Sequence, residues 1–182
     1  VISLVRLGIA ISEPYLGVRL VDLIRVVIIE IYCLRRLLES EAAYYACANI
    51  TPQALEDIQE ILDKYQDVLL TPPMNAKEIH LINREFHFSI FAISGMKRTC
   101  DMIEGLWDVL SFFKMLYGET LLVTPEGKRK MIAEHQSYVD FLRAGDAGGL
   151  REATKRNIEN KLERYLNSFG SSEAAPPESI KA

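Results

Sequence analysis

Apolar residues recur at intervals of three and four along most of the chain, which is the spacing that buries one face of an α-helix. Candidate N-caps such as Asp22 and Thr51, and glycines such as Gly95 and Gly145, mark where these helices begin and end. No strand-like alternation follows Val21, and the connections are short. The pattern therefore predicts an all-α protein, an antiparallel bundle of about six helices. The expected helices cover residues 22–48, 52–71, 74–94, 97–117, 125–144 and 146–169.

The two ends of the chain differ from this helical middle. Residues 1–20 contain two short apolar segments around a Pro/Gly turn, which predicts a hairpin. Residues 170–182 are rich in Ser, Ala, Pro and Glu, a composition typical of a disordered tail. The folded helical domain is therefore expected over residues 21–169.

Composition narrows the class of protein. The 182 residues carry a net charge of −4, so the chain has no basic excess that would bind nucleic acid. Charged residues interrupt every apolar stretch that is long enough to cross a bilayer, which argues against a membrane span or a secretion signal. Three cysteines without a CxxC spacing, Cys33, Cys47 and Cys100, predict reduced thiols in a cytoplasmic protein.

The clearest candidate chemistry lies in the third expected helix. Asn83 and His87 are four residues apart, so their side chains project from one face of that helix. His135 and Asn157 belong to the inward faces of the fifth and sixth helices. Packing these three helices together would gather the four side chains around one interior point, where bundles hold cofactors and ligands. The alternative is that the histidines are hydrogen-bonded core residues, because burying an unsatisfied polar group costs about 1–3 kcal/mol.

Several motifs in the same order resemble those of a known family. They are Tyr32-x-x-Arg35-x-x-x-Glu39 with Ala42 and Ala43, Asn83-x-x-Phe86-His87 with Ile93-Ser94-Gly95, and Glu134-His135 followed by Gly145-Asp146. Together they resemble the FCD domain, the C-terminal effector domain of GntR-family bacterial transcription regulators. The resemblance covers roughly residues 20–168.

The resemblance implies a helical bundle whose interior binds a small carboxylate, in many members through a divalent metal held by one Asp and three His. By resemblance, Asn83 occupies the Asp position, His87 and His135 are the first two histidines, and Asn157 stands where the third is expected. An amide in place of a carboxylate removes a negative charge, which weakens metal binding. The four residues are therefore expected to bind either a divalent metal (Zn, Ni or Mn) or the carboxylate effector directly.

Arg35 is a further candidate for binding the effector. Its side chain lies on the inward face of the first helix, and a guanidinium binds a carboxylate through two parallel hydrogen bonds. The competing interpretation is an ion pair with Glu39, four residues along the helix.

The resemblance also implies a homodimer that reads DNA through an N-terminal winged helix-turn-helix of about 70 residues. Residues 1–20 resemble only the end of such a module, its last helical turn and wing. The chain is therefore expected to be either part of a longer regulator or a member that has lost DNA reading.

Two other classes of function stay open. A metal-dependent enzyme needs an open coordination position and a general base, and we place neither Glu85 nor Glu134 on the ligand face. No Ser/His/Asp or Cys/His set is apparent either, so we predict that the chain is not an enzyme. The third class is a purely structural dimerisation module with a polar network in its core.

Overall fold

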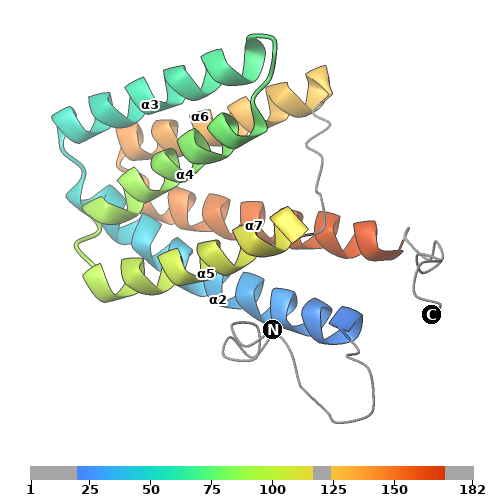
Figure 1. Ribbon diagram of the computed structural model, residues 1–182. Coiled ribbons are helices and arrows are strands. Elements are labelled where there is room, and N and C mark those ends of the chain that lie inside the picture. Colours follow the sequence, from blue (N-terminus) through green and yellow to red (C-terminus); the bar gives the residue numbers. More distant parts are fainter. Residues whose placement is uncertain (1–19, 117–123, 171–182) are drawn as a thin grey trace, which may run out of the picture.

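The computed structural model describes residues 20–116 and 124–170 (Figure 1). Within these ranges the chain forms helices only, so the predicted all-α class is confirmed. The expected hairpin at the start of the chain and the expected tail lie outside the described residues, except for their innermost positions. The helices are α2 (Leu20–Asn49), α3 (Pro52–Leu70), α4 (Ala76–Ile93), α5 (Lys97–Leu116), α6 (Pro125–Ala144) and α7 (Ala147–Gly170).

Local capping explains most of the helix boundaries. The Thr51 side chain accepts a hydrogen bond from the Ala54 backbone N–H, and the Asn75 side chain caps α4 in the same way. Gly145 ends α6 in the left-handed conformation, with φ of 68°. The expected cap at Asp22 was wrong, because α2 begins at Leu20 and includes Asp22. No proline or glycine lies between Gly17 and Asp22 to keep the helix from starting earlier.

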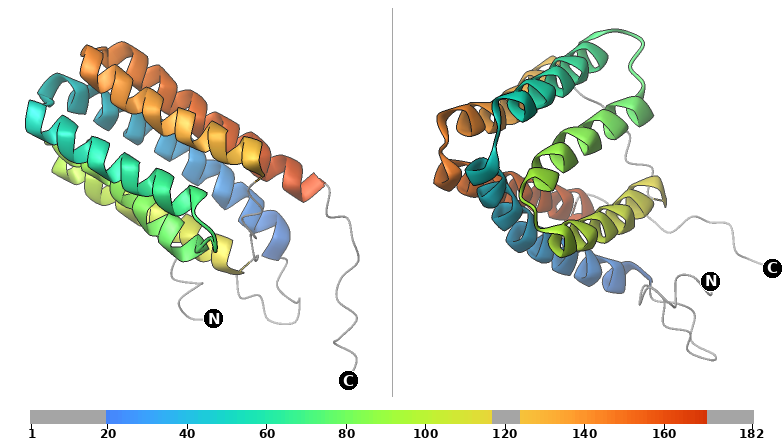
Figure 2. Two further views of the ribbon diagram at one scale, coloured as in Figure 1. Left: turned by 90° about the horizontal axis from the view of Figure 1, so that it is seen from above. Right: turned by 90° about the vertical axis from the view of Figure 1, so that its left-hand side faces the viewer.

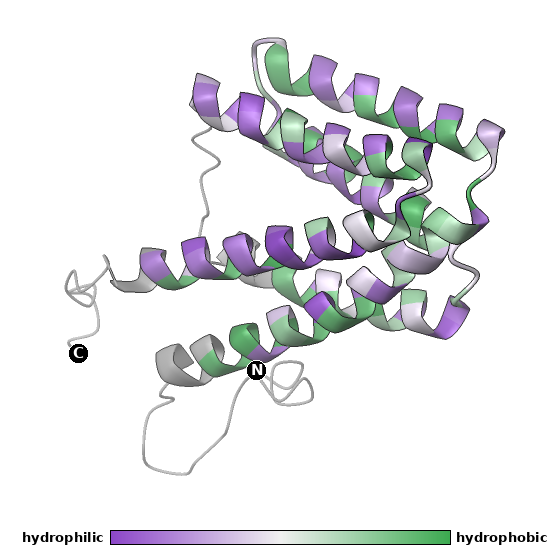
Figure 3. Ribbon diagram, turned by 180° about the vertical axis from the view of Figure 1, so that it is seen from behind, coloured by the Kyte–Doolittle hydropathy of each residue, from purple (hydrophilic) through white to green (hydrophobic). Residues whose placement is uncertain are grey.

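The helices pack in two groups that face each other across the bundle. In Figures 1 and 2, α3, α4 and α6 lie on one side, and α2, α5 and α7 lie on the other. The long helix α2 contacts α4, α5 and α7, while α3 contacts α4 and α6. Figure 3 shows a hydrophilic and a hydrophobic side on most helices, as expected for amphipathic elements around a shared interior.

Three clusters of buried apolar side chains hold the bundle together. The largest joins α2, α3, α4, α6 and α7 around fully buried residues such as Leu62 and Phe86. The second joins α2, α5 and α7 around Ile28, and the third packs Phe91 against α2 and α5. Tyr65, Tyr32 and Trp107 belong to one cluster each, and all three also line a single cavity. The fold therefore places this cavity where the three clusters meet.

Candidate functional site

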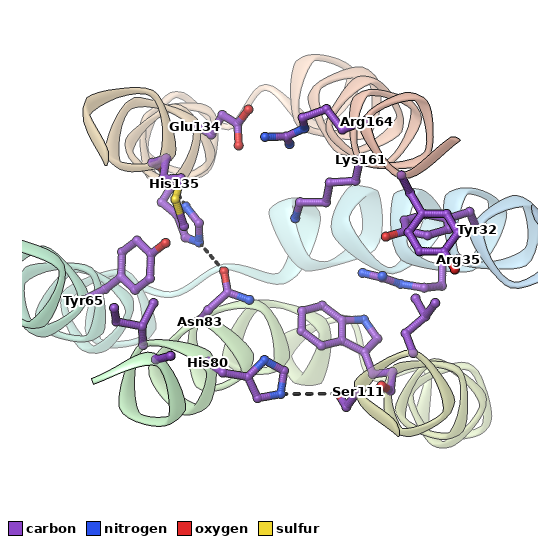
Figure 4. A pocket seen from close by; sticks show the side chains of 16 residues that line it. Tyr32, Arg35, Tyr65, His80, Asn83, Ser111, Glu134, His135, Lys161 and Arg164 are labelled. Carbon is purple, nitrogen blue, oxygen red and sulfur yellow. Dashed lines mark hydrogen bonds between the residues drawn. The ribbon is translucent and has the colours of Figure 1, made fainter. Parts of the chain in front are cut away.

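A cavity of about 290 Å³ opens between the helices, and each of the six contributes to its wall (Figure 4). Its volume is at the lower end of the range of about 300–1,000 Å³ that is usual for small-molecule sites. The lining combines apolar and aromatic side chains with polar side chains that reach in from several helices. The lining consists of Tyr32, Arg35, Tyr65, Ala76, Ile79, His80, Asn83, Trp107, Leu110, Ser111, Met131, Glu134, His135, Lys161, Arg164 and Tyr165.

Three of the side chains singled out from the sequence meet at one end of this cavity. Asn83 on α4 and His135 on α6 both line it, with 3.0 Å between Asn83 Oδ1 and His135 Nε2. The imidazole rings of His87 and His135 lie 5.1 Å apart between centroids, and each residue is only 3% exposed. The helices therefore bring these groups together, as the spacing in the sequence suggested.

The hydrogen bonds of His135 fix its tautomer. Its Nδ1 lies 2.8 Å from the Met131 carbonyl oxygen, which can only accept, so Nδ1 carries the proton. Burial is the main cause that lowers the pKa of His135 to about 4, and the charge of Lys161 lowers it further. At neutral pH the Nε2 atom is therefore an acceptor that faces Asn83. Two acceptors cannot share a hydrogen bond, so the Asn83 amide must be turned over from its orientation in Figure 4. Its NH₂ group then donates to His135 Nε2, and Oδ1 is an acceptor on the cavity side.

His87 and Asn157 lie behind the cavity wall and do not line it. Neither ring nitrogen of His87 has a hydrogen-bond partner among the described residues, and Tyr138 and Trp107 pack within 5.6 Å of the ring. Burial lowers the pKa of His87 well below its ordinary value, and Lys161 adds to this effect. Asn157 hydrogen-bonds the Tyr138 hydroxyl, while its Oδ1 is buried without a partner among those residues. These two groups are close to the cavity but separated from it.

Arg35 lines the cavity and is also half of a buried ion pair. Its Nε lies 2.5 Å from Glu39 Oε1, and the same carboxylate accepts a hydrogen bond of 2.7 Å from Trp107 Nε1. The guanidinium lies over the Trp107 ring, 4.5 Å from its centroid. The ion pair expected from the sequence is thus present, and it positions Arg35 at the cavity wall.

Sequence reasoning missed two cations on α7, Lys161 and Arg164, both of which line the cavity. The charge of Lys161 influences His87 and His135, so its ammonium lies near both rings. In Figure 4 its side chain points toward the centre of the cavity. The signal was available, because Lys161 and Arg164 follow Asn157 by four and seven residues and so continue its inward face.

Three further residues of the cavity wall add to the site. Glu134 lines the cavity, so placing it away from the ligand face was wrong. The cavity extends beyond the side chain of His135, so Glu134, the preceding residue of α6, also reaches it. His80 also lines the cavity, and its Nε2 lies 3.3 Å from Ser111 Oγ. Tyr65 on α3 lines the cavity as well, and it stacks on His135 with 4.4 Å between ring centroids.

Neither a cluster of metal-binding side chains nor a membrane-spanning helix is found among the described residues. No group of three or more His, Cys, Asp or Glu side chains in these ranges is arranged to hold a metal ion. The predicted set also includes two asparagines, which are not among these residue types, so the metal stays a prediction. Within the same part of the chain, every helix is too short or too polar to cross a bilayer.

Comparison with known proteins decides the family. Residues 30–160 match the FCD domain. The chain belongs to the FCD family. The HTH-type transcriptional regulator McbR of Escherichia coli K12 is 31% identical to this FCD domain over 160 residues, which is 86% of this chain and 67% of that protein. This relative of the chain is therefore a transcription regulator, as the sequence motifs indicated.

Solved structures of such regulators share the fold of this FCD domain. The structure of E. coli McbR/YncC matches with a TM-score of 0.69 at 26% identity, over 92% of this chain and 81% of that one. A GntR-family regulator from Pseudomonas syringae pv. tomato DC3000 matches with a TM-score of 0.66 at 20% identity, over 94% of this chain and 70% of that one. At 20% identity the second likeness concerns the fold alone.

Proposed function

We propose that this FCD domain senses a small carboxylate, which it binds directly in the cavity between the six helices. In the intact homodimeric regulator, acting in the bacterial cytoplasm, occupancy of the cavity would bias the placement of two DNA-binding modules. Such coupling requires the acid to bind the two arrangements with different affinity. The observation that carries the proposal is the set of cations, Arg35, Lys161 and Arg164, that lines a partly open cavity in a regulatory domain.

The cations have the right chemistry for a carboxylate. Glu39 engages Nε and one Nη of Arg35, and the guanidinium has further N–H groups that this carboxylate does not use. Lys161 adds a second positive charge near His87 and His135. Burial of Arg35 strengthens its charge-assisted hydrogen bonds, because few water molecules compete for the same groups. A carboxylate between Arg35 and Lys161 would therefore be held by two cations from the neighbouring helices α2 and α7.

The side chains present fit a tightly bound divalent metal poorly. The predicted set of Asn83, His87, His135 and Asn157 contains no carboxylate that would offset a double positive charge. The positive charges of Lys161 and Arg35 act on the same region, and they would repel a dication. We therefore assign the binding of the acid to the cations and treat metal analysis as a separate test.

Calorimetric titration with small mono-, di- and tricarboxylates at fixed ionic strength tests the proposal. At least one acid should bind, and Lys161→Met should weaken it by about tenfold or more, because a buried charge-assisted hydrogen bond contributes about 1.5–3 kcal/mol. Ala76 lines the cavity at an exposed position, so Ala76→Trp should obstruct the opening without removing a polar group and weaken binding. Ala92→Trp adds the same side chain to an exposed position of α4 that does not line the cavity, and binding should persist. Failure of every acid to bind the wild-type chain would refute the proposal.

A further inference from the structure

We propose that two copies of this chain pair through the outer face shared by α2 and α5, around a two-fold axis, with Glu30 of each chain beside Arg98 of the partner subunit. The apolar part of this face is called the α2–α5 strip, and none of its residues lines the cavity. It consists of Leu34, Leu37, Leu38, Met102, Leu106 and Val109. The inference builds on the homodimer of the proposed function and does not depend on what the cavity binds.

Large apolar side chains are exposed on these two helices more often than elsewhere. Of the eight that are exposed among the described residues, four stand on α2 and one on α5. Leu34, Leu37 and Met102 of the strip are 46%, 56% and 57% exposed. Single apolar residues on a surface are ordinary, whereas a contiguous apolar patch marks a surface that binds another molecule. The position of these side chains relative to one another therefore decides what they mean.

The exposed side chains continue the contact between α2 and α5, which lie side by side in Figures 1 and 2. Leu38 and Leu106 are half-buried, and each packs on a buried cluster that joins the two helices. Leu34 precedes Leu38 by four residues, so it lies on the same face of α2, with Leu37 beside it. Met102 precedes Leu106 on α5 by the same interval. The strip is therefore one continuous apolar surface.

Two charged side chains on this face have no ion-pair partner. Among the described side chains of α2 and α5, only Glu30 and Arg98 are charged and unpaired, and both are exposed. The other charged side chains there form ion pairs: Arg35, Arg36, Glu39, Glu41, Lys97, Asp101, Glu104 and Asp108. Glu30 stands four residues before Leu34 and Arg98 four before Met102, so both project on the side of the strip.

The positions of Glu30 and Arg98 are self-complementary. The two helices run in opposite directions, because the first half of α2 packs against the second half of α5, and the middle of α2 against the first half of α5. Glu30 therefore marks one end of the strip and Arg98 the other. A two-fold rotation about the middle of the strip exchanges its ends, which brings each Glu30 to the partner's Arg98. Two ion pairs then flank an apolar centre, as is usual for a protein–protein interface.

The area of this face is sufficient for a dimer. Residues 26–45 of α2 span about 30 Å, and two adjacent helices are about 20 Å wide, so each chain offers about 600 Å². The two chains together would bury about 1,200 Å², the lower end of the range for specific, stable interfaces. Gly105 is exposed on α5 near the middle of the strip, with open space where a side chain would stand. Its missing side chain lets a helix of a second chain approach closely.

Sedimentation equilibrium over a series of protein concentrations tests the inference. The wild-type chain should be a dimer at about 100 µM. Leu37→Glu and Met102→Glu should each weaken dimerisation by about 100-fold or more, because every dimer loses two buried apolar side chains. Leu81→Glu is the matched control, since Leu81 is 54% exposed on α4, outside the strip, and this variant should stay dimeric. Circular dichroism of each variant checks that the helices are formed.

An exchange of charges tests the two-fold arrangement itself. Glu30→Arg and Arg98→Glu should each weaken dimerisation by roughly tenfold, because like charges then meet at both ends of the strip. The double variant Glu30→Arg/Arg98→Glu should recover most of the affinity, because opposite charges meet again with their signs exchanged. Two independent surface effects would add in the double variant instead of cancelling.

Four results would overturn the inference. They are a wild-type chain that stays monomeric at about 100 µM, a dimer that survives both Leu37→Glu and Met102→Glu, an equal loss in Leu81→Glu, and a charge-exchanged double variant that does not recover. Binding of acids to the cavity is measured separately by calorimetry, so the carboxylate function can fail or hold independently of these results.

Discussion

Replacing Glu39 by Gln should destabilise the bundle strongly, because it leaves the buried Arg35 charge without its counter-ion. Arg35 and Glu39 are 5% and 2% exposed, and breaking a buried ion pair by removing one partner costs about 3–5 kcal/mol. The amide oxygen can keep the bonds from Arg35 Nε and Trp107 Nε1, which share one oxygen of Glu39, but its NH₂ group then faces an Nη donor of Arg35. For a chain of this size, about 2–4 °C of melting temperature is lost per kcal/mol, so a fall of about 6–20 °C is expected.

A neighbouring ion pair that joins α2 to α7 supplies the control. Arg36 and Glu159 form an ion pair of 2.8 Å, but their side chains are 43% and 52% exposed, so Glu159→Gln should cost about 1 kcal/mol or less. Both substitutions are compared with the wild type by urea unfolding and thermal melting. The double variant Arg35→Met/Glu39→Leu should recover much of the loss, since no buried charge then remains. Equal stability of Glu39→Gln and Glu159→Gln would contradict the reasoning.

The remaining predictions concern pH, packing and metal. Unfolded histidine has a pKa near 6.5 and folded His135 near 4, so the unfolded state binds the proton first and stability is lost as pH falls from about 6.5 to about 4. This difference in pKa corresponds to about 3 kcal/mol in the free energy of unfolding. Urea unfolding at several pH values should show that His135→Asn reduces this loss of stability. An identical pH profile for the wild type and the variant would refute the assignment to His135. Gly149→Ala should destabilise by about 1–3 kcal/mol in the same assay, because the added methyl group would collide with Phe141 and Asp146. Gly148→Ala has room and should be neutral or stabilising by up to about 1 kcal/mol, so similar losses for the two variants would sink the packing argument. Metal analysis of the chain after chelator dialysis and readdition of zinc, nickel or manganese should find no stoichiometric metal and no change in melting temperature, and one tightly held ion per chain would overturn the assignment to cations.

The helices were predictable because their signals are local. Caps such as Thr51 and Asn75, and the left-handed Gly145, depend only on residues a few positions away. The approach of His87 to His135 followed from helical spacing together with the assumption that the apolar faces pack inward. Asp22 was misplaced because a capping side chain is a preference, which a helix can override when nothing before it prevents an earlier start.

The shape of the cavity could not be read from the sequence. Whether a residue lines the cavity or lies behind its wall depends on a few ångströms of packing, which separate Asn83 from His87 although both lie on one face of α4. Lys161 was overlooked and Glu134 was misplaced because charged residues on amphipathic helices usually face solvent. Their role becomes visible only when α6 and α7 are placed around the shared cavity.

A crystal structure of the chain with the tightest-binding acid of the screen tests the central claim most directly. The account predicts that the acid lies inside the cavity, with its carboxylate oxygens within about 4 Å of both the Arg35 guanidinium and the Lys161 ammonium, the distance of an ion pair. An acid bound outside the cavity, or one held there through a metal ion on His87 and His135, would contradict it.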